Sequence, residues 1–346
     1  MGQHIHPARV RRAASIVRHG GRGVQDYFCC RPRIGTNSAK SVWHPAPAAG
    51  QRHRTAEKNT VSERAGRLAH RQRRAGAWHQ KHAGTQGTDH RQWRAPDHHR
   101  TKFYSTGALF AHWVAVKALD DQGRQIMAFV KRGTPGLRIV DDWSGFGQRT
   151  TASGTVLLDN VAVDAGQVVD NWRLALTPNI QGAVSQLIQA AIDAGIARSA
   201  IDDAIAFVRE KSRPWIDANV ERASDDLYVI ADIGKLKLEL HAAEALLRKA
   251  GQELDEINAA PIDEHSAARA SIAVARAKVM TTEISLLASE KLFELAGSRA
   301  TLAEFNLDRH WRNARVHTLH DPVRWKYHAV GTWHLNGTLP ARHSWI

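Results

Sequence analysis

The residues best suited to acid–base chemistry lie near the end of the chain. His317 and His320 stand one helical turn apart, and Asp321 lies between His320 and Pro322. An imidazole with an ordinary pKa near ~6.5 can supply or hold a proton at neutral pH, and a carboxylate can accept one. Histidines at this spacing can also cap a helix end, or lie in a core with their hydrogen bonds satisfied. His317 fits that structural interpretation better than His320.

Two further groups carry hydrogen-bonding or cationic side chains. The first is Tyr104, Ser105 and Thr106, which follow a strand-like run and offer hydroxyl groups. The second is rich in cations, and an arginine in such a group could hold a phosphate with two parallel hydrogen bonds. Its members stand in two separate runs, Lys211 and Arg213 in one and Gly297, Ser298 and Arg299 in the other, and only a family resemblance places them together. For Lys211 and Arg213, the alternative is a solvated basic helix end near the negative pole of the helix dipole.

The elements that would position these residues begin at Lys102. Runs such as HWVAVKAL and RQIMAFVKR flank an Asp-Asp-Gln-Gly turn at 120–123, which predicts a hairpin. Thr134, Pro135 and Gly136 predict another turn, and GTVLLDNVAV at 154–163 predicts one further strand. We therefore expect a small antiparallel, barrel-like β domain over 101–172.

After Asn179 the apolar period becomes helical. One stripe has steps of three and four and comprises Ile180, Val184, Leu187, Ile188, Ala191, Ile192 and Ile196. A second runs through Val229, Ile233, Leu236, Leu240, Ala243 and Leu247, behind Ser224 as N-cap. A third is marked by Ile272, Val279, Leu286 and Phe293 and ends at Gly297. With further helices over 303–317 and after Pro322, these stripes predict a four-helix bundle over 173–346, and an α+β protein overall.

The first hundred residues differ sharply in composition. They hold 20 Lys+Arg against five Asp+Glu, whereas residues 101–346 hold 28 against 29. Only ten of these hundred residues are Leu, Ile, Val or Phe, and 11 of the 20 histidines of the chain lie here. So few large apolar groups cannot offset the entropy of ordering the chain. We expect residues 1–100 to be disordered or irregular.

Three interpretations of this segment stay open. A basic tail could bind nucleic acid through phosphate charge, but its tryptophans are isolated and it has no zinc-finger or helix-turn-helix spacing, which disfavours nucleic acid. The pairs His4/His6 and His98/His99 lack the partners of a metal site, so no metal is expected. A solvated basic tail is the plainest alternative. The composition fits better with a translation of GC-rich DNA in the wrong frame, joined to a true frame near Thr101.

Compartment follows from cysteine usage and hydropathy. Cys29 and Cys30 are adjacent, so a bridge between them would be strained, and residues 101–346 contain no cysteine. No apolar run has the length of a signal peptide or a membrane span. We expect a cytoplasmic protein without membrane contact.

Four motifs, in order, resemble the acyl-CoA dehydrogenase superfamily. KFYSTG at 102–107 is similar to its Lys-x-Trp-Ile-Thr-Asn stretch, with Tyr104 at the Trp position and Thr106 at the Thr position. GTVLLDNVAV resembles the strand that ends its middle domain, and FVREKSRPW at 207–215 resembles a helix segment that reaches a neighbouring subunit's flavin. FNLDRHWRNARVHTLHDPV at 305–323 resembles its closing segment, with Arg312 at the Arg of Arg-Asp-Ala. The resemblance spans about two thirds of the chain, from 102 to 335.

One departure from the dehydrogenases points to a particular branch. They carry Tyr-Glu-Gly-Thr, with the Glu as base, where this chain has His320, Asp321, Pro322 and Val323. HTLHDPVRWKYHAVG instead resembles the flavin monooxygenase branch, which includes dibenzothiophene monooxygenases and sulfur-acquisition oxidoreductases. The resemblance implies a reduced flavin that meets O2 and oxygenates a small organosulfur compound, with His320 and Asp321 as catalytic residues. An FAD-dependent acyl-CoA dehydrogenase is the alternative.

The resemblance also assigns the binding groups and partners. Tyr104, Ser105 and Thr106 would lie along the flavin edge. Gly297, Ser298 and Arg299 stand at the family's flavin loop, where Arg299 could hold a phosphate. Lys211 takes the Arg position of the segment that reaches a neighbouring subunit's flavin, with Arg213 close by. Reduced FMN from a separate flavin reductase is expected, with FAD as the alternative, and the family's bundle face implies a homotetramer. Family members have an N-terminal helical domain that covers the flavin. Because residues 1–100 stand in its place, we expect weak flavin affinity and little coupled oxygenation.

Overall fold

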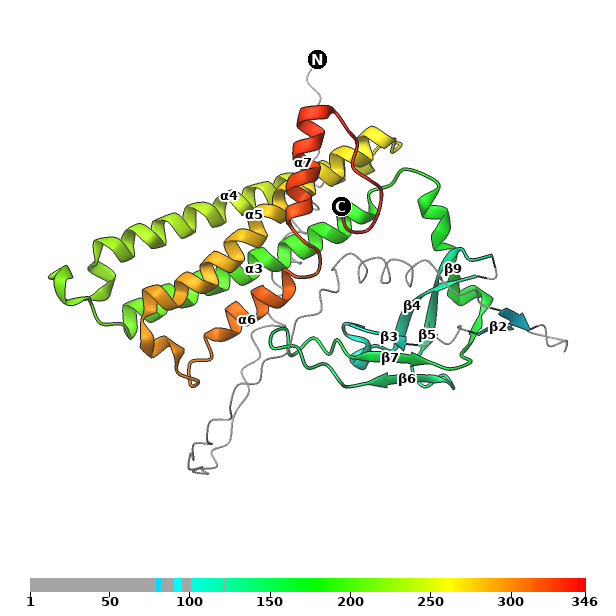
Figure 1. Cartoon of the computed structure of the whole chain (residues 1–346), viewed down its shortest axis with the longest axis horizontal. Coiled ribbons are helices and arrows are strands. Elements are labelled where there is room, and N and C mark those ends of the chain that lie inside the picture. The colour runs from blue at the N-terminus through cyan, green and yellow to red at the C-terminus, as the bar shows by residue number, and fades with distance from the viewer. Residues whose placement is uncertain (1–78, 82–89, 95–100, 121) are drawn as a thin grey trace, which may run out of the picture.

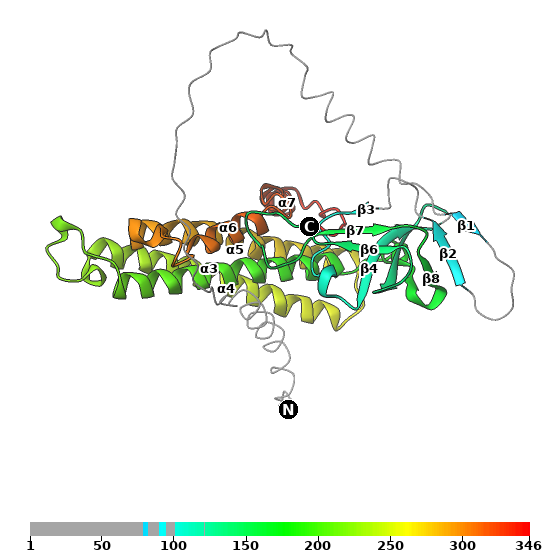
Figure 2. The same cartoon turned by 90° about the horizontal axis from the view of Figure 1, so that it is seen from below.

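The computed structural model describes residues 79–81, 90–94, 101–120 and 122–346. Strands occupy the first part of this region and helices the second, and the two parts lie side by side along the long axis (Figures 1 and 2). An α+β protein is thereby confirmed. The strands are β1 (His79–Lys81), β2 (His90–Arg94), β3 (Thr101–Lys102), β4 (Trp113–Leu119), β5 (Gln125–Lys131), β6 (Leu137–Val140), β7 (Thr155–Leu158), β8 (Ala162–Asp164) and β9 (Val168–Val169).

Nine described strands form three small antiparallel sheets, in the orders β1-β2-β8, β3-β7-β6 and β4-β5-β9. The predicted hairpin is confirmed, because β4 pairs with β5 from Trp113↔Lys131 to Leu119↔Gln125. Alternate residues of both strands are buried, as the period of two requires. Val114, Val116, Ile126 and Val130 thus contribute to the core between the sheets.

One sequence expectation about the strands is wrong. GTVLLDNVAV forms two strands, β7 and β8, because Asn160 adopts a left-handed φ of 49° and turns the chain between them. Residues 1–100 are expected to be disordered or irregular; of these, the described residues 79–81 and 90–94 form β1 and β2, which pair with each other, and β2 also pairs with β8. The remaining expectations for residues 1–100, including the cysteine pair, the nucleic-acid tail and the histidine pairs, lie outside the described residues.

Five α-helices follow in the described chain. They are α3 (Gln181–Glu210), α4 (Leu227–Asn258), α5 (Glu264–Ala296), α6 (Asp308–His317) and α7 (Arg324–Asn336). The predicted stop at Gly297 is confirmed, since this residue caps α5 with φ 80°. The predicted cap Ser224 is wrong. Asp226 caps α4 instead, and its carboxylate accepts a hydrogen bond from the Tyr228 backbone N–H at 2.8 Å.

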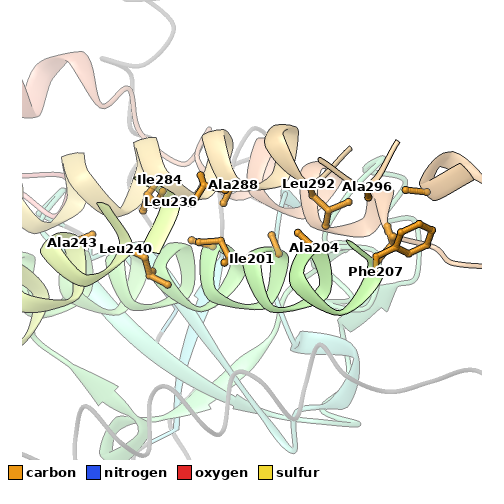
Figure 3. Close-up of a cluster of buried hydrophobic side chains, with 14 residues drawn as sticks. Ile201, Ala204, Phe207, Leu236, Leu240, Ala243, Ile284, Ala288, Leu292 and Ala296 are labelled. Carbon is orange, nitrogen blue, oxygen red and sulfur yellow. The ribbon is translucent and has the colours of Figure 1, made fainter. Parts of the chain in front are cut away.

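Small residues decide which helix faces pack together. The stripe predicted for α4 is buried at Leu236, Leu240 and Ala243. On α3, however, Val184 and Ile188 are exposed, and the buried face consists largely of alanines. Alanines let helices approach closely, so α3 packs through them against α5, with leucines and isoleucines filling the remaining space (Figure 3). Side-chain size, which the apolar period does not encode, selects this face.

The loop 141–150 joins the strand region to the helices. Phe146 stacks on Trp311 of α6 with ring centroids 5.9 Å apart, and the Gln148 backbone N–H donates to Asn313 Oδ1 at 2.7 Å. Gly147 lies so close that an added Cβ would be 1.9 Å from the backbone oxygen of Arg312. Glycine is therefore required for the loop to meet α6.

Replacing Gly147 with alanine should lower the free energy of unfolding by about 1–3 kcal/mol, the usual cost of overpacking. The physical reason is that the clash is with backbone atoms of α6, which cannot rotate away. Urea unfolding followed by circular dichroism measures the change. Gly195→Ala in α3 is the control, because its Cβ meets nothing within 4 Å and should add about 0.5–1 kcal/mol of stability. Equal effects of both variants would contradict this prediction.

Candidate active site

The Tyr104–Thr106 segment forms a strained, hydroxyl-rich turn after β3. Thr106 Oγ1 lies 2.8 Å from Ser153 Oγ, which lies 2.7 Å from Thr151 Oγ1, and Thr151 donates onward to the Gln148 carbonyl at 2.8 Å. Tyr104 is exposed, and its ring meets Trp143 edge to face with centroids 6.1 Å apart. The turn is thereby linked to the loop 141–150 that packs on α6.

Strained backbone gathers in this region. Tyr104, Gln148 and Ala152 all adopt left-handed φ values, of 55°, 54° and 47°. Such conformations cost of the order of 1–3 kcal/mol each for residues with side chains, and they cluster at functional sites. In addition, Gln148 Nε2 is buried and has no hydrogen-bond partner in the described part of the chain. A ligand that accepts hydrogen bonds would satisfy that donor.

His320 follows the C-terminal end of α6 and is exposed. Its Nδ1 atom lies 3.0 Å from the backbone oxygen of His317. The side chain lines a cavity of about 590 Å³, shared with Trp325 and His328 of α7 and with Trp345 of the C-terminal segment. This volume is in the range of small-molecule sites. A proton-carrying group therefore faces a ligand-sized cavity.

Asp321 has a different environment from its neighbour. It is buried, and one of its carboxylate oxygens lies 3.0 Å from Lys326 Nζ, which is also buried. Burial lowers the pKa of Lys326, and the Asp321 carboxylate opposes that shift. Lys326 also donates to the backbone oxygen of Trp345. The pair thus ties the loop after α6 to the C-terminal segment, and this geometry favours an orienting role for the predicted catalytic Asp321.

A buried polar network lies behind the histidines, and no sequence motif pointed to it. Asp193 of α3 accepts from His317 Nδ1 at 2.5 Å through Oδ1, and from Lys278 Nζ and Thr282 Oγ1 of α5, each at 2.9 Å, through Oδ2. Burial raises the pKa of Asp193, but its contacts with His317 and Lys278 outweigh burial and hold that pKa below the ordinary value. The sequence signal that could have revealed this network is a charged residue on an otherwise apolar helix face, namely Asp193 on α3 and Lys278 on α5.

A second aspartate–histidine contact joins the same two helices. Asp203, ten residues after Asp193 on α3, lies 2.8 Å from His310 Nε2 near the start of α6, and Arg309 also donates to it. Burial lowers the pKa values of His310 and His317, and the aspartates oppose this only in part. Both imidazoles are therefore neutral at neutral pH.

The free energy of unfolding should fall as the pH drops from about 7 to 5. Buried His310 and His317 have folded-state pKa values below the ordinary 6.5, so the unfolded chain binds more protons in this window and gains stability relative to the folded chain. Each histidine contributes at most about 1.4 kcal/mol per pH unit. Urea unfolding at several pH values measures the slope. His310→Gln should reduce it and the exposed His241→Gln should not; a flat profile would contradict the prediction.

The predicted cation group lies elsewhere in the protein. Lys211 Nζ and Arg299 Cζ lie 5.6 and 5.8 Å from the centre of the Phe305 ring, and Gly297 and Ser298 are exposed beside them. Exposed Arg213 follows two residues after Lys211. His317 contacts α3 at Asp193, and Lys211 is 18 residues further along, about 27 Å at ~1.5 Å per residue. The structure therefore separates this cation group from the His320 end of α6.

The acyl-CoA dehydrogenase resemblance implies a strand region followed by long helices, and the structure has that architecture. The strand region carries a hydroxyl-rich turn, and the end of α6 presents His320. A family model described as "Acyl-CoA dehydrogenase, C-terminal domain" matches residues 187–325. The similarities of the chain therefore lie with the flavin monooxygenase branch of the acyl-CoA dehydrogenase superfamily.

Three known proteins document that similarity. The probable FMNH2-dependent monooxygenase SfnC of Pseudomonas putida is 32% identical over 249 residues, which cover 69% of this chain and 62% of that relative. The dibenzothiophene monooxygenase TdsC from Paenibacillus sp. A11-2 has a solved structure with 29% identity and a TM-score of 0.68, covering 74% of this chain and 68% of that one. The solved structure of methanesulfinate monooxygenase MsuC from Pseudomonas fluorescens has 29% sequence identity and a TM-score of 0.68, and the match covers 78% of this chain and 69% of that one. The chain thus spans less than two thirds of the length of SfnC.

Among the described residues, no three His, Cys, Asp or Glu side chains are grouped as a metal site would require. None of the described helices has the length and apolar character needed to span a bilayer.

Proposed function

We propose that this chain is a monooxygenase that uses reduced FMN and O2 to oxygenate a small organosulfur compound. The observation that carries the proposal is His320, whose imidazole lines a cavity of about 590 Å³ beside the end of α6. Support comes from relatives named as an FMNH2-dependent monooxygenase and as monooxygenases of dibenzothiophene and methanesulfinate. When bound, reduced flavin supplies the electrons that activate O2 for transfer of one oxygen atom.

The residues of the β3 turn fit an edge of a flavin ring. Ser105 and Thr106 offer hydroxyl groups, Tyr104 and Trp143 offer aromatic surface, and Gln148 Nε2 is a buried donor with no partner among the described residues. The flavin ring carries several hydrogen-bond acceptors at its edge, so the donor and the ring are complementary. We assign Tyr104, Ser105 and Thr106 to cofactor binding on these grounds.

His320 would hold or deliver the proton that oxygen transfer requires. An imidazole can do both near neutral pH. The cavity wall also includes the rings of Trp325 and Trp345, and such apolar surface restricts water at the reacting atoms. Asp321 would act on this side chain by fixing the loop that carries it, since its own carboxylate is paired with Lys326.

The end of α6 fits a monooxygenase better than an acyl-CoA dehydrogenase. That reaction needs a carboxylate that removes a proton from the substrate, and Asp321 stands at the corresponding place. Because Asp321 is buried against Lys326 at 3.0 Å, it would have to break a buried ion pair first, which is costly. Nucleic-acid binding would depend on residues 1–100, most of which lie outside the described residues.

The cation group supports an assembly of several copies. Lys211 lies about 27 Å along α3 from the His317 contact, and Arg299 lies beside it at the Phe305 ring, too far to share one flavin with His320 in the same copy. We therefore propose that they hold the phosphate end of a flavin bound by a neighbouring subunit, in a homotetramer. A separate flavin reductase would supply the reduced FMN; FAD is the alternative cofactor.

The organisation of the whole chain is proposed on the same basis. Residues 101–172 would form a barrel-like middle domain and 173–346 a four-helix bundle domain, while the expectation for residues 1–100 falls mostly outside the described residues. The protein would be cytoplasmic.

The decisive experiment supplies the purified full chain with FMN, a flavin reductase, a reductant and isotopically labelled O2. Methanesulfinate and dibenzothiophene are offered as substrates, and mass spectrometry detects labelled product while a peroxide assay measures the uncoupled fraction. We expect labelled product in a small yield and peroxide in a large one. Absence of product at every FMN concentration, together with reduction of bound flavin by an acyl-CoA without air, would favour the dehydrogenase instead.

A further inference from the structure

The position of His320 at the end of α6 determines which of its ring nitrogens carries the proton. Its Nδ1 atom lies 3.0 Å from the backbone oxygen of His317, which also accepts the His320 backbone N–H at 3.2 Å. A carbonyl oxygen can only accept hydrogen bonds, so Nδ1 must be the protonated nitrogen of the neutral ring. The free lone pair is then on Nε2. A free histidine side chain favours the opposite tautomer, so the protein imposes this one.

The carbonyl that selects the tautomer belongs to a residue that is itself firmly held. His317 is 2% exposed, and its Nδ1 is 2.5 Å from Asp193 Oδ1. The other oxygen of Asp193 is occupied by Lys278 and Thr282 of α5, and all of these side chains are buried. Three helices therefore converge on one carboxylate. Any shift of His317 would move the oxygen that His320 contacts.

We propose that Asp193 is a positioning residue that, by anchoring His317, holds His320 in the Nδ1–H tautomer with Nε2 directed to the cavity. Asp193 does not line that cavity, and it acts only through His317. The tautomer is a property of the folded chain. The use of Nε2 in oxygen transfer rests on the proposed function, and the two parts are tested by separate measurements.

The chain contains a matched control for this proposal. Asp203 also lies on α3 and also binds a histidine of α6, His310, at 2.8 Å. That contact is near the start of α6, whereas Asp193 acts at its end. If aspartates on α3 served only to dock α6, Asp193→Asn and Asp203→Asn would have similar consequences. If Asp193 positions His320, only the first would affect the His320 ring.

The test uses nitrogen-15 NMR of the full chain labelled at histidine. The His320 signals are identified by their loss in His320→Gln, and the chemical shifts of its two ring nitrogens report the tautomer ratio. We expect the Nδ1–H form to dominate in the unmodified chain. Asp193→Asn should reduce the Nδ1–H to Nε2–H ratio about fivefold, the factor expected for one lost hydrogen bond of ordinary strength, and Asp203→Asn should leave it unchanged.

A second variant protects the test against misfolding. Asp193→Asn leaves the Lys278 cation without its partner, so Asp193→Asn/Lys278→Met removes both charges together, and it should shift the His320 ratio in the same direction. No shift in either Asp193 variant, an equal shift in Asp203→Asn, or an Nε2–H form in the unmodified chain would overturn the proposal.

Product yield in the oxygenation assay separates the two levels of inference. If the chain oxygenates, Asp193→Asn should reduce labelled product about tenfold or more, as loss of an orienting partner commonly does, and Asp203→Asn should not. If the unmodified chain forms no product while the His320 tautomer still depends on Asp193, the proposed function fails and the positioning role stands. If product falls equally in both variants, the positioning role fails.

Discussion

Asp193→Ala should lower the free energy of unfolding by about 3–5 kcal/mol, the largest stability effect that we expect from a single substitution in this chain. The substitution leaves the Lys278 ammonium, which is 1% exposed, without its counter-charge, and deprives His317 and Thr282 of their acceptor. Desolvating an unpaired charge costs far more than an ordinary contact contributes. Urea unfolding at pH 7, followed by circular dichroism, measures the loss.

The double variant Asp193→Leu/Lys278→Met tests the cause of that loss. It replaces the ion pair by apolar side chains, so no unpaired charge remains, and such replacements are often neutral for stability. We expect it to be clearly more stable than Asp193→Ala, although His317 still loses its acceptor. If the double variant is as unstable as the single one, the unpaired Lys278 is not the source of the loss.

His320→Gln should reduce labelled oxygenation product by about 10²–10⁴-fold, the usual contribution of a proton-transferring side chain. Glutamine retains a hydrogen-bonding group but does not titrate near neutral pH. Because the His320 side chain is exposed, the free energy of unfolding should change by less than about 0.5 kcal/mol. Product is measured by mass spectrometry with reduced FMN and labelled O2, and unfolding in urea.

His328→Gln is the matched control, because His328 lines the same cavity from α7 and is also exposed. It should alter product yield far less than His320→Gln. Equal losses in the two variants would show that the cavity tolerates no change in its lining, and would remove the special role assigned to His320. Retained product in His320→Gln would refute its catalytic assignment directly.

Local spacing predicted the elements that depend on local interactions. The β4–β5 hairpin, the buried stripe of α4, the end of α5 at Gly297 and the helix after Pro322 are all present. Errors arose where a longer-range contact or a single backbone angle decided the outcome. Asn160 breaks a run that reads as one strand, and the alanine face of α3 is buried in preference to Ile188.

The candidate site shows the same division. Sequence motifs located His320 and the Tyr104–Thr106 turn, because each lies in a short run of distinctive residues. They gave no indication that Asp193 and Lys278, 85 residues apart, form a buried pair at 2.9 Å. The motifs also gave no indication that the Asp321 carboxylate forms an ion pair with Lys326. Pairing across helices depends on the distance between faces, which a single sequence without relatives does not encode.

The sequence by itself therefore determined the α+β class, the family resemblance, the two-part charge distribution and a set of candidate site residues. The tertiary structure decided which of those residues meet: it joined the β3 turn to α6 through Gly147 and Gln148, and placed the Lys211–Arg299 group far along the bundle. The physical reason is that periodicity and turn chemistry act between neighbours in the chain. Close packing and the cost of burying an unpaired charge act between residues that only the fold brings together.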